Sequence, residues 1–273
     1  MATDRRRRVL LFLERQPRTS VTEMAEILAI APRTLRSDLR ALLAEGRTFE
    51  LYGDERVEAP AGERRHEGDF DQRQRANADA KREIARWAAG LVKDGDTILL
   101  DGSTTVAAMV PFLAGRRNLV VLTNGIESGR RMAENCTNSV ILVAGVLQPD
   151  GASVVGPLYE PVLRNYHIKT AFVSCCGFSL TAGLTELDAN EAAIKIDMVA
   201  LAETTVLLAD SSKFGRVFPS PFARADQVTH IFSDGGLAPF WSRQVQAASI
   251  VLTLCSPSSQ VKPWSPMLPP AGS

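Results

Sequence analysis

Short hydrophobic runs recur at fairly regular intervals through the last two thirds of this chain. Each run is four or five residues long, is rich in β-branched residues and leads into a polar or glycine-rich stretch. Helix-like segments fill several of the gaps, and this alternation is typical of an α/β fold with a mostly parallel sheet. The predicted strands are 97–101, 119–123, 140–144, 171–174, 206–210, 228–232 and 250–254.

The first 58 residues follow a different pattern, in which hydrophobic residues recur at helical spacing. Residues 4–16 predict one helix. A second begins near Ser20, which has the capping-box spacing with Glu23. Pro32 suits the first turn of a third helix, which is expected to end near Gly46. Loose alternation around Gly53 then predicts a hairpin.

The third predicted helix has one leucine-rich face and one arginine-rich face. At a rotation of about 100° per residue, Arg33, Ser37 and Arg40 lie opposite four leucines, with Arg36 beside them. This division, on a helix that follows another helix and a short turn, is typical of a helix-turn-helix DNA-binding motif. The alternative is a small helical bundle whose arginine face is exposed to solvent. Arginine contacts guanine edges in a bidentate manner, while serine and threonine hold phosphates. The predicted DNA-binding residues are Ser20, Thr22, Arg33, Thr34, Arg36, Ser37 and Arg40.

Two polar stretches divide the chain. Residues 59–75 lack periodicity and predict a linker, and the Pro- and Ser-rich residues 256–273 predict a disordered tail. The sequence therefore predicts a winged helix-turn-helix domain at 1–58 and an α/β effector-binding domain at 76–255.

Charge and cysteine content narrow the class of protein. The formal net charge is zero, but residues 1–47 hold ten Arg and six Asp or Glu, an excess that favours a nucleic-acid partner. Taken alone, the four consecutive arginines 5–8 are interpreted as the solvent-exposed first turn of a helix. The four cysteines form no CxxC pair and are expected to be reduced, and no histidine has zinc-ligand spacing, so no metal or cofactor is expected. Without a signal peptide or a membrane span, we expect a cytoplasmic protein.

Polar residues follow several predicted strands, where an open α/β sheet binds its ligands. Residues 103–105 offer hydroxyls and amides at a helix start, which favours a phosphate, and residues 123–125 form a second such turn. Lys195 and Lys213 are candidates to pair with the anion. Glu191 and Asp210 are candidates to accept hydrogen bonds from sugar hydroxyls. Each feature alone also fits an ordinary turn or cap. The predicted effector-binding residues are Asp101, Ser103, Thr104, Thr105, Thr123, Asn124, Gly125, Gly145, Glu191, Lys195, Asp210, Ser212 and Lys213.

The stretch "ILAIAPRTLRSDLRALLAEG" resembles the DNA-binding motif of the DeoR family of bacterial transcription regulators. Residues 76–236 resemble the sensor domain of that family in the order of "DGSTTVA", "VVLTNG", "VILVAG", "GLTELDANEAAIKIDM" and "LLADSSKFG". Three positions depart from the family pattern: Ala31 stands where a capping serine is usual, Ser37 where an arginine is common, and Tyr52 begins the wing triplet in place of histidine.

The resemblance implies a function. The sensor domain of the family is similar in fold to ribose-5-phosphate isomerase, an enzyme that carries an acidic run after a central strand. The comparable residues here, 173–180, contain no acid, so a sensor is favoured over a catalyst and no catalytic residue is assigned. The resemblance implies a homo-oligomer, dimer or tetramer, that binds a double-stranded DNA operator. It also implies a repressor of carbohydrate genes that responds to a phosphorylated sugar. The alternatives are a sugar-phosphate isomerase-like enzyme and a purely architectural DNA-binding protein.

Overall fold

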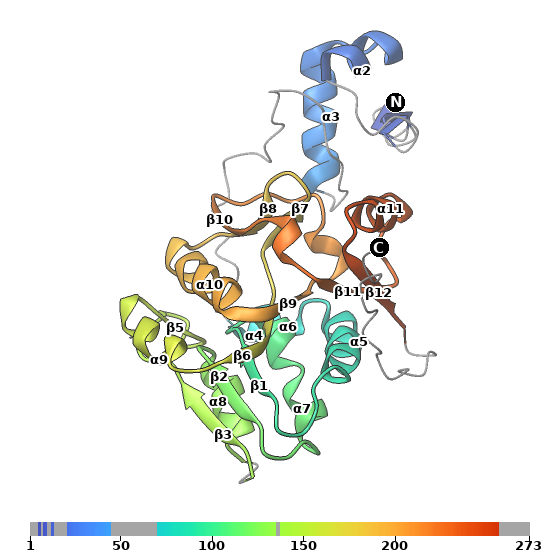
Figure 1. The fold of residues 1–273 in the computed structure, drawn as a ribbon. Coiled ribbons are helices and arrows are strands. Elements are labelled where there is room, and N and C mark those ends of the chain that lie inside the picture. The colour runs from blue at the N-terminus through green and yellow to red at the C-terminus, as the bar shows by residue number, and fades with distance from the viewer. Residues whose placement is uncertain are drawn as a thin grey trace, which may run out of the picture. The chain divides into compact units, whose positions relative to one another are not determined.

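The computed structural model describes residues 5–6, 8–9, 12–13, 21–44, 70–134 and 137–256 (Figure 1). The chain divides into two compact units. One comprises residues 1–67 with 214–216, and the other comprises 68–213 with 217–273. Each unit is described by itself.

The N-terminal unit contains the expected pair of helices. Helix α2 spans Val21–Leu28 and α3 spans Pro32–Ala44, with Pro32 in the first turn as predicted. Ala29, at φ 52°, turns the chain between them. The buried side chains of both helices join those of the first helical segment in one core: Val9, Leu13, Val21, Met24, Ala25, Ile30, Leu35, Leu39 and Leu42. The predicted hairpin lies outside the described residues.

A buried carboxylate ties the first helical segment to α3. Asp38 on α3 is 2% exposed and accepts from Arg5, whose Nη2 lies 3.0 Å from Asp38 Oδ1 and whose Nε also donates. Arg6 approaches the same carboxylate at 3.6 Å. The sequence alone indicated a solvated arginine run. Two of its members instead compensate the charge of Asp38 beneath the helix that carries the predicted DNA-binding residues.

The second unit is built on a seven-stranded sheet in the order β12-β11-β9-β6-β1-β2-β3. Every neighbouring pair is parallel, and each strand overlaps one of the seven predicted runs. The strands are β1 (Thr97–Leu100), β2 (Val120–Thr123), β3 (Ser139–Leu142), β6 (Ile168–Val173), β9 (Ala202–Leu208), β11 (His230–Asp234) and β12 (Val251–Cys255).

The chain order creates a switch point between β1 and β6. From β1 the chain moves outward through β2 and β3, then returns to β6 on the other side of β1 and continues outward to β12. Connections therefore diverge at the carboxyl ends of β1 and β6, where open α/β sheets bind their ligands.

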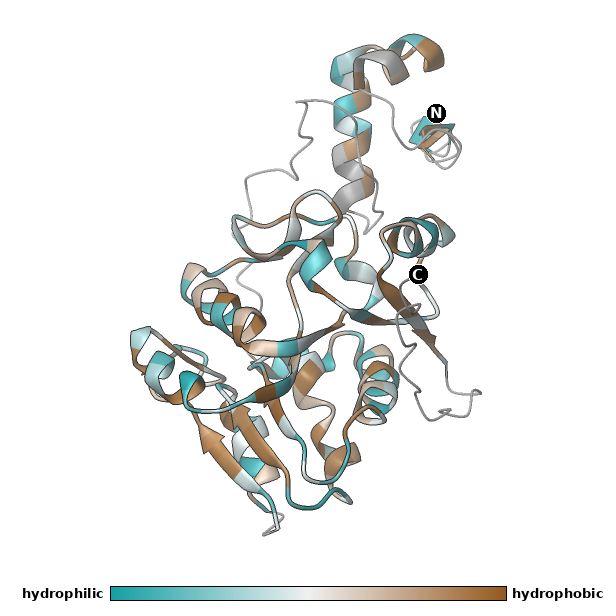
Figure 2. Cartoon of the chain, viewed as in Figure 1, coloured by the Kyte–Doolittle hydropathy of each residue, from teal (hydrophilic) through white to brown (hydrophobic). Residues whose placement is uncertain are grey.

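Helices cover the sheet and bury its hydrophobic residues. Alternate residues such as Ile98 and Leu100 face a cluster that includes Ile84 and Ala88 of α5. In Figure 2 the hydrophobic residues concentrate on strands such as β2 and β3. The helices of this unit are α4 (Phe70–Arg75), α5 (Ala78–Ala89), α6 (Thr104–Ala107), α7 (Val110–Leu113), α8 (Ile126–Met132), α9 (Glu160–Arg164), α10 (Ala189–Leu201) and α11 (Pro239–Ala247), with short 3-10 turns η1 (Pro157–Tyr159), η2 (Ser211–Lys213) and η3 (Ala225–Gln227).

Five short strands were not predicted. β7 (Gly177–Ser179), β8 (Gly183–Glu186) and β10 (Ser220–Ala223) form an antiparallel sheet, and β4 (Val146–Leu147) pairs with β5 (Val154–Val155) as a hairpin. Helix α4 is also new, because the sequence indicated an aperiodic linker over residues 59–75. No helix in the described ranges has the length and apolar character to cross a membrane. Those ranges also contain no cluster of three or more potential metal-binding side chains.

A buried histidine in the sheet makes stability depend on pH. Burial lowers the pKa of His230 from 6.5 to about 4. The ring stacks on Phe232 and its Nε2 lies 2.8 Å from Thr253 Oγ1. The unfolded chain binds a proton as the pH falls through 6.5, whereas the folded chain resists until about 4. Stability is therefore fully present above pH 6.5 and is lost on acidification, by about 2 kcal/mol at pH 5.

Urea unfolding of the wild type and of His230→Gln at pH 7 and pH 5 measures this contribution. We expect the wild type to lose about 2 kcal/mol more than the variant between the two values. An equal loss in both proteins would contradict the assignment.

Candidate functional site

Two strands end in the same local structure. After β1, Asp101 Oδ1 accepts from the amide of Ser103 at 3.0 Å and from its hydroxyl at 2.5 Å. After β9, Asp210 Oδ1 accepts from the amide of Ser212 at 3.0 Å and also from its hydroxyl. Aspartate favours such turns because its side chain bonds to the backbone two residues ahead. Both aspartates are almost fully buried.

The first of these turns lies at the switch point of the sheet. Asp101 Oδ2 accepts from the amide of Ser174 at 2.8 Å, and Ser174 directly follows β6. This hydrogen bond joins the loop after β1 to the loop after β6 at the carboxyl edge of the sheet.

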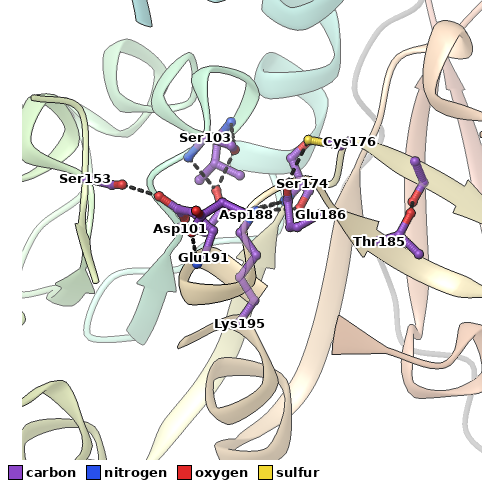
Figure 3. A network of polar contacts seen from close by, with 12 residues as sticks. Asp101, Ser103, Ser153, Ser174, Cys176, Thr185, Glu186, Asp188, Glu191 and Lys195 are labelled. Carbon is purple, nitrogen blue, oxygen red and sulfur yellow. Dashed lines mark hydrogen bonds and ion pairs between the residues drawn. The ribbon is translucent and has the colours of Figure 1, made fainter. Parts of the chain in front are cut away.

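A buried lysine lies against this turn (Figure 3). Lys195 of α10 is 3% exposed, and its Nζ lies 3.0 Å from Asp101 Oδ2, 2.5 Å from Glu186 Oε1 and 2.9 Å from Ser174 O. Burial alone lowers the pKa of Lys195, but the carboxylates of Asp101, Glu186 and Glu191 raise it well above its ordinary value. The lysine is therefore a permanent cation that is already paired.

Two further acids complete the cluster. Glu186, at the end of β8, accepts from Cys176 Sγ at 2.8 Å. Glu191 accepts from the hydroxyl of Ser153, and burial raises its pKa although Lys195 and that hydrogen bond oppose the change. Figure 3 shows Ser153 reaching this acid from the β4–β5 hairpin. Three carboxylates thus surround one ammonium group, so the cluster is rich in acceptors.

The loop after β2 packs against the same hairpin. Thr123 Oγ1 accepts from the amide of Gly125 at 3.0 Å, and Asn124 Nδ2 donates to Val154 O at 3.2 Å. A β-carbon on Gly102 would lie 2.6 Å from Ser153 Cβ, so glycine permits the close approach of the β1 loop to this hairpin.

Two buried side-chain oxygens that can only accept hydrogen bonds are left over in the described part of the chain. Asn124 Oδ1 and Asp210 Oδ2 have no hydrogen-bond partner within the described part of the chain, although Asn124 is fully buried and Asp210 is 2% exposed. Buried polar atoms normally find a partner. These two atoms therefore remain available to donors of a bound molecule.

The structure changes the interpretation of three predicted residues. Gly145 accommodates Val155, because a β-carbon there would lie 2.3 Å from Val155 O; its small size serves the β4–β5 hairpin. Lys195 forms ion pairs with carboxylates, and the amide and hydroxyl of Ser103 donate hydrogen bonds to Asp101.

Other predicted residues lie in the turns after β9 and β1. Lys213 lies on η2 beside Asp210, where its amide donates to Asp210 O at 3.0 Å. Thr104 and Thr105 are buried in the first turn of α6.

Sequence reasoning missed Ser153, Ser174 and Glu186. The stretch 173–180 does lack acids, yet the fold brings Glu186 from β8 to within hydrogen-bonding distance of Cys176. The hairpin of β7 and β8 makes this contact, and the sequence offered only the weak signal of a turn between them. Cys175 is likewise buried, and its burial raises the pKa of that thiol, in keeping with a reduced packing residue.

The predicted DNA-binding residues lie mainly on α3. Arg33 and Ser37 are exposed, and Thr34 and Arg36 are half-buried. On the opposite face, Leu35, Leu39 and Leu42 are buried. Ser20 lies outside the described residues, as do the side chains of Thr22 and Arg40. The division of α3 into a core face and a polar face is therefore confirmed for the described side chains, and DNA contact stays a prediction.

Residues 76–235 match the family described as "DeoR C terminal sensor domain". The chain is 29% identical over 253 residues to the "Uncharacterized HTH-type transcriptional regulator YulB" of Bacillus subtilis, covering 93% of this chain and 96% of that protein. It is 30% identical over 233 residues to the "L-fucose operon activator" of Haemophilus influenzae, covering 84% and 90%. Among solved structures, ribose 5-phosphate isomerase A of Methanocaldococcus jannaschii matches 50% of this chain and 55% of its own at 20% identity, with a TM-score of 0.39.

Proposed function

This chain belongs to the DeoR family of transcription regulators, and we propose that it represses carbohydrate-metabolism genes until a phosphorylated sugar binds its second unit. Like its relatives, it is a DNA-binding transcription regulator and not an enzyme. The observation that carries the proposal is the set of loops held together at the switch point, with two buried acceptors unfilled.

The chemistry of the loops favours a ligand with both hydroxyl groups and an anionic group. Asp210 Oδ2 and Asn124 Oδ1 accept from hydroxyls, since both atoms are buried without a donor. The anionic group belongs away from Glu186 and Glu191, near Lys213 and the start of α6, because like charges repel. A phosphorylated sugar has both features. We therefore retain the predicted effector-binding residues as the lining of its site, with Gly145, Ser103 and Lys195 shaping the loops around it.

The acid cluster does not favour the isomerase alternative. Moving a proton between adjacent carbons needs a base that is free to accept it. Lys195 is held protonated by its carboxylate neighbours, and Asp101 and Glu186 are both hydrogen-bonded to it or to the backbone. The arrangement supports binding without turnover.

The N-terminal unit acts on double-stranded DNA in this proposal. Residues 1–58 form the DNA-binding domain, and residues 59–75 join it to the sensor, with α4 at the end of the join. A dimer or tetramer places paired α3 helices in successive major grooves, so the operator contains repeated half-sites. A ligand that binds one state of the sensor more tightly shifts the population of chains toward that state. In that state the paired α3 helices no longer match the spacing of the half-sites.

A thermal-shift screen of phosphorylated sugars tests the proposal. A sugar phosphate present at 100 times its Kd should stabilise the full chain by about 2.7 kcal/mol, and the same compound should release the chain from DNA in a mobility-shift assay. Asp210→Asn should weaken both effects, and inorganic phosphate should stabilise less than the sugar phosphate.

Other outcomes identify the alternatives. Stabilisation by no compound, or stabilisation without any change in DNA binding, would favour the architectural reading. Isomerisation of a pentose phosphate by the purified chain would favour the enzyme.

A further inference from the structure

Helix α4 is a six-residue helix at the end of the segment that precedes the sensor. A helix this short is not stable alone, so its contacts must hold it. Arg73 Nη2 lies 2.6 Å from Asp150 Oδ2, and the buried Lys81 of α5 donates to the carbonyl oxygen of Arg73. Both contacts bind α4 to the body of the sensor.

Asn77, the second of the two residues between α4 and α5, makes a second link. Asn77 has φ 54°, a left-handed conformation that asparagine tolerates better than most residues, and it occupies the N-cap of α5. Its side chain makes no capping hydrogen bond. Instead, Asn77 Nδ2 donates to Asp210 Oδ1 at 3.2 Å and to Ser212 Oγ at 3.4 Å.

These contacts connect α4 to three loops of the candidate site. Helix α4 packs against α6, which begins directly after the Asp101 turn. Asp150, the partner of Arg73, lies in the turn of the β4–β5 hairpin that carries Ser153 to Glu191. Asn77 holds the Asp210 turn. In the sequence, residues 45–69 connect α4 to α3 of the N-terminal unit.

We propose that α4 and Asn77 form the relay through which occupation of the sensor reaches the DNA-binding unit. The inference rests on the proposed function and assigns its regulation to Arg73 and Asn77, two positioning residues outside the predicted effector-binding set. Asp210 is the point of coupling, because its Oδ1 accepts from Asn77 while its buried Oδ2 is unfilled. A ligand donor at Oδ2 reorients the same carboxylate that holds Asn77.

The first test needs no ligand. Hydrogen exchange is followed in the full chain for the wild type, Asp210→Ala and Arg75→Gln, where Arg75 is an exposed residue of α4. Alanine removes the oxygen that accepts from Asn77, so we expect the amides of residues 70–77 to exchange several times faster in Asp210→Ala and at the wild-type rate in Arg75→Gln. Unchanged exchange at residues 70–77 in Asp210→Ala would overturn the proposal.

The second test measures the coupling itself. The DNA probe is a duplex selected from a random pool by the wild-type chain, and the ligand probes are ribose 5-phosphate, fructose 6-phosphate and glucose 6-phosphate. Allosteric couplings are typically about 5- to 150-fold. We expect the responsive sugar phosphate to change wild-type DNA affinity within that range, and Asn77→Gly or Arg73→Gln to reduce the change to less than about 2-fold. Glycine retains the left-handed backbone at position 77, so this variant removes only the amide side chain.

The outcomes separate the relay from the sensor. In Asn77→Gly the Kd for the sugar phosphate should stay within about 3-fold of wild type, as expected when coupling rather than binding is lost. Arg75→Gln should respond as the wild type does. A full DNA response in Asn77→Gly overturns the relay. A wild-type chain that binds DNA but responds to no probe contradicts the proposed function instead, and the exchange measurement still decides whether the Asp210 turn and α4 are coupled.

Discussion

Replacing Arg33 and Arg36 together with alanine is expected to lower affinity for the operator by about 100-fold or more, because each bidentate contact to a base contributes about 1–3 kcal/mol. Both residues lie on the polar side of α3, and the buried Leu35 and Leu39 anchor the opposite face. Alanine is a good helix former, so the helix itself should survive. Mobility-shift titrations with a selected duplex measure the loss.

A matched control separates base contacts from a general loss of charge. Arg82 and Arg243 are exposed residues of the second unit, and their double alanine variant changes the net charge by the same amount. We expect its DNA affinity to stay within about 3-fold of wild type, since a change in net charge alone acts through interactions that salt screens. Equal losses in the two double variants, or no loss in Arg33→Ala/Arg36→Ala, would contradict the assignment of α3 as the reading helix.

Lys195→Met is expected to destabilise the second unit by about 3–5 kcal/mol, the usual result of removing one partner from a buried ion pair. Methionine has nearly the length of lysine, so the change removes the charge and leaves most of the packing. Asp101 and Glu186 are then left buried without their cation. Urea unfolding at pH 7 measures the loss.

The surface pair of Lys169 and Asp96 provides the control. Lys169 lies on β6 of the same sheet but its side chain is 48% exposed. Exposed pairs contribute about 0–1 kcal/mol, so Lys169→Met should be nearly neutral. Adding Glu186→Gln to Lys195→Met should restore part of the lost stability, because the two residues are in contact and their effects are not additive. A small loss in Lys195→Met would show that the lysine is free to bind a ligand.

The parallel sheet could be predicted because its strands are defined locally. Each of the seven runs is short, mostly hydrophobic and contains β-branched residues, so composition alone marks the strand. The short strands β4 and β5 and the helix α4 have no such pattern. Tertiary contacts form them, as the bond between Arg73 and Asp150 illustrates, and a single sequence does not reveal those contacts.

The candidate site was predictable where topology determines it. Asp101 and Asp210 follow central strands, and the carboxyl ends of parallel strands share one edge of the sheet. The partners of Lys195 were not predictable, because Glu186 arrives on an antiparallel strand outside the main sheet. The same lysine is consistent with an anion-binding role in the sequence and with a structural cation in the fold, and only the distances separate the two interpretations.

The order of the strands has a consequence for synthesis of the chain. The N-terminal unit has its own hydrophobic core within the first 44 residues. The proposed effector site needs the loops that contain Asp101, Ser174 and Asp210, so it is incomplete until translation has passed residue 210. Domains fold from the N-terminus during synthesis. A product that ends before residue 210 would therefore retain the core of α2 and α3 without the proposed effector site. A nonsense mutation before that codon is expected to yield a chain whose DNA binding does not respond to a sugar phosphate.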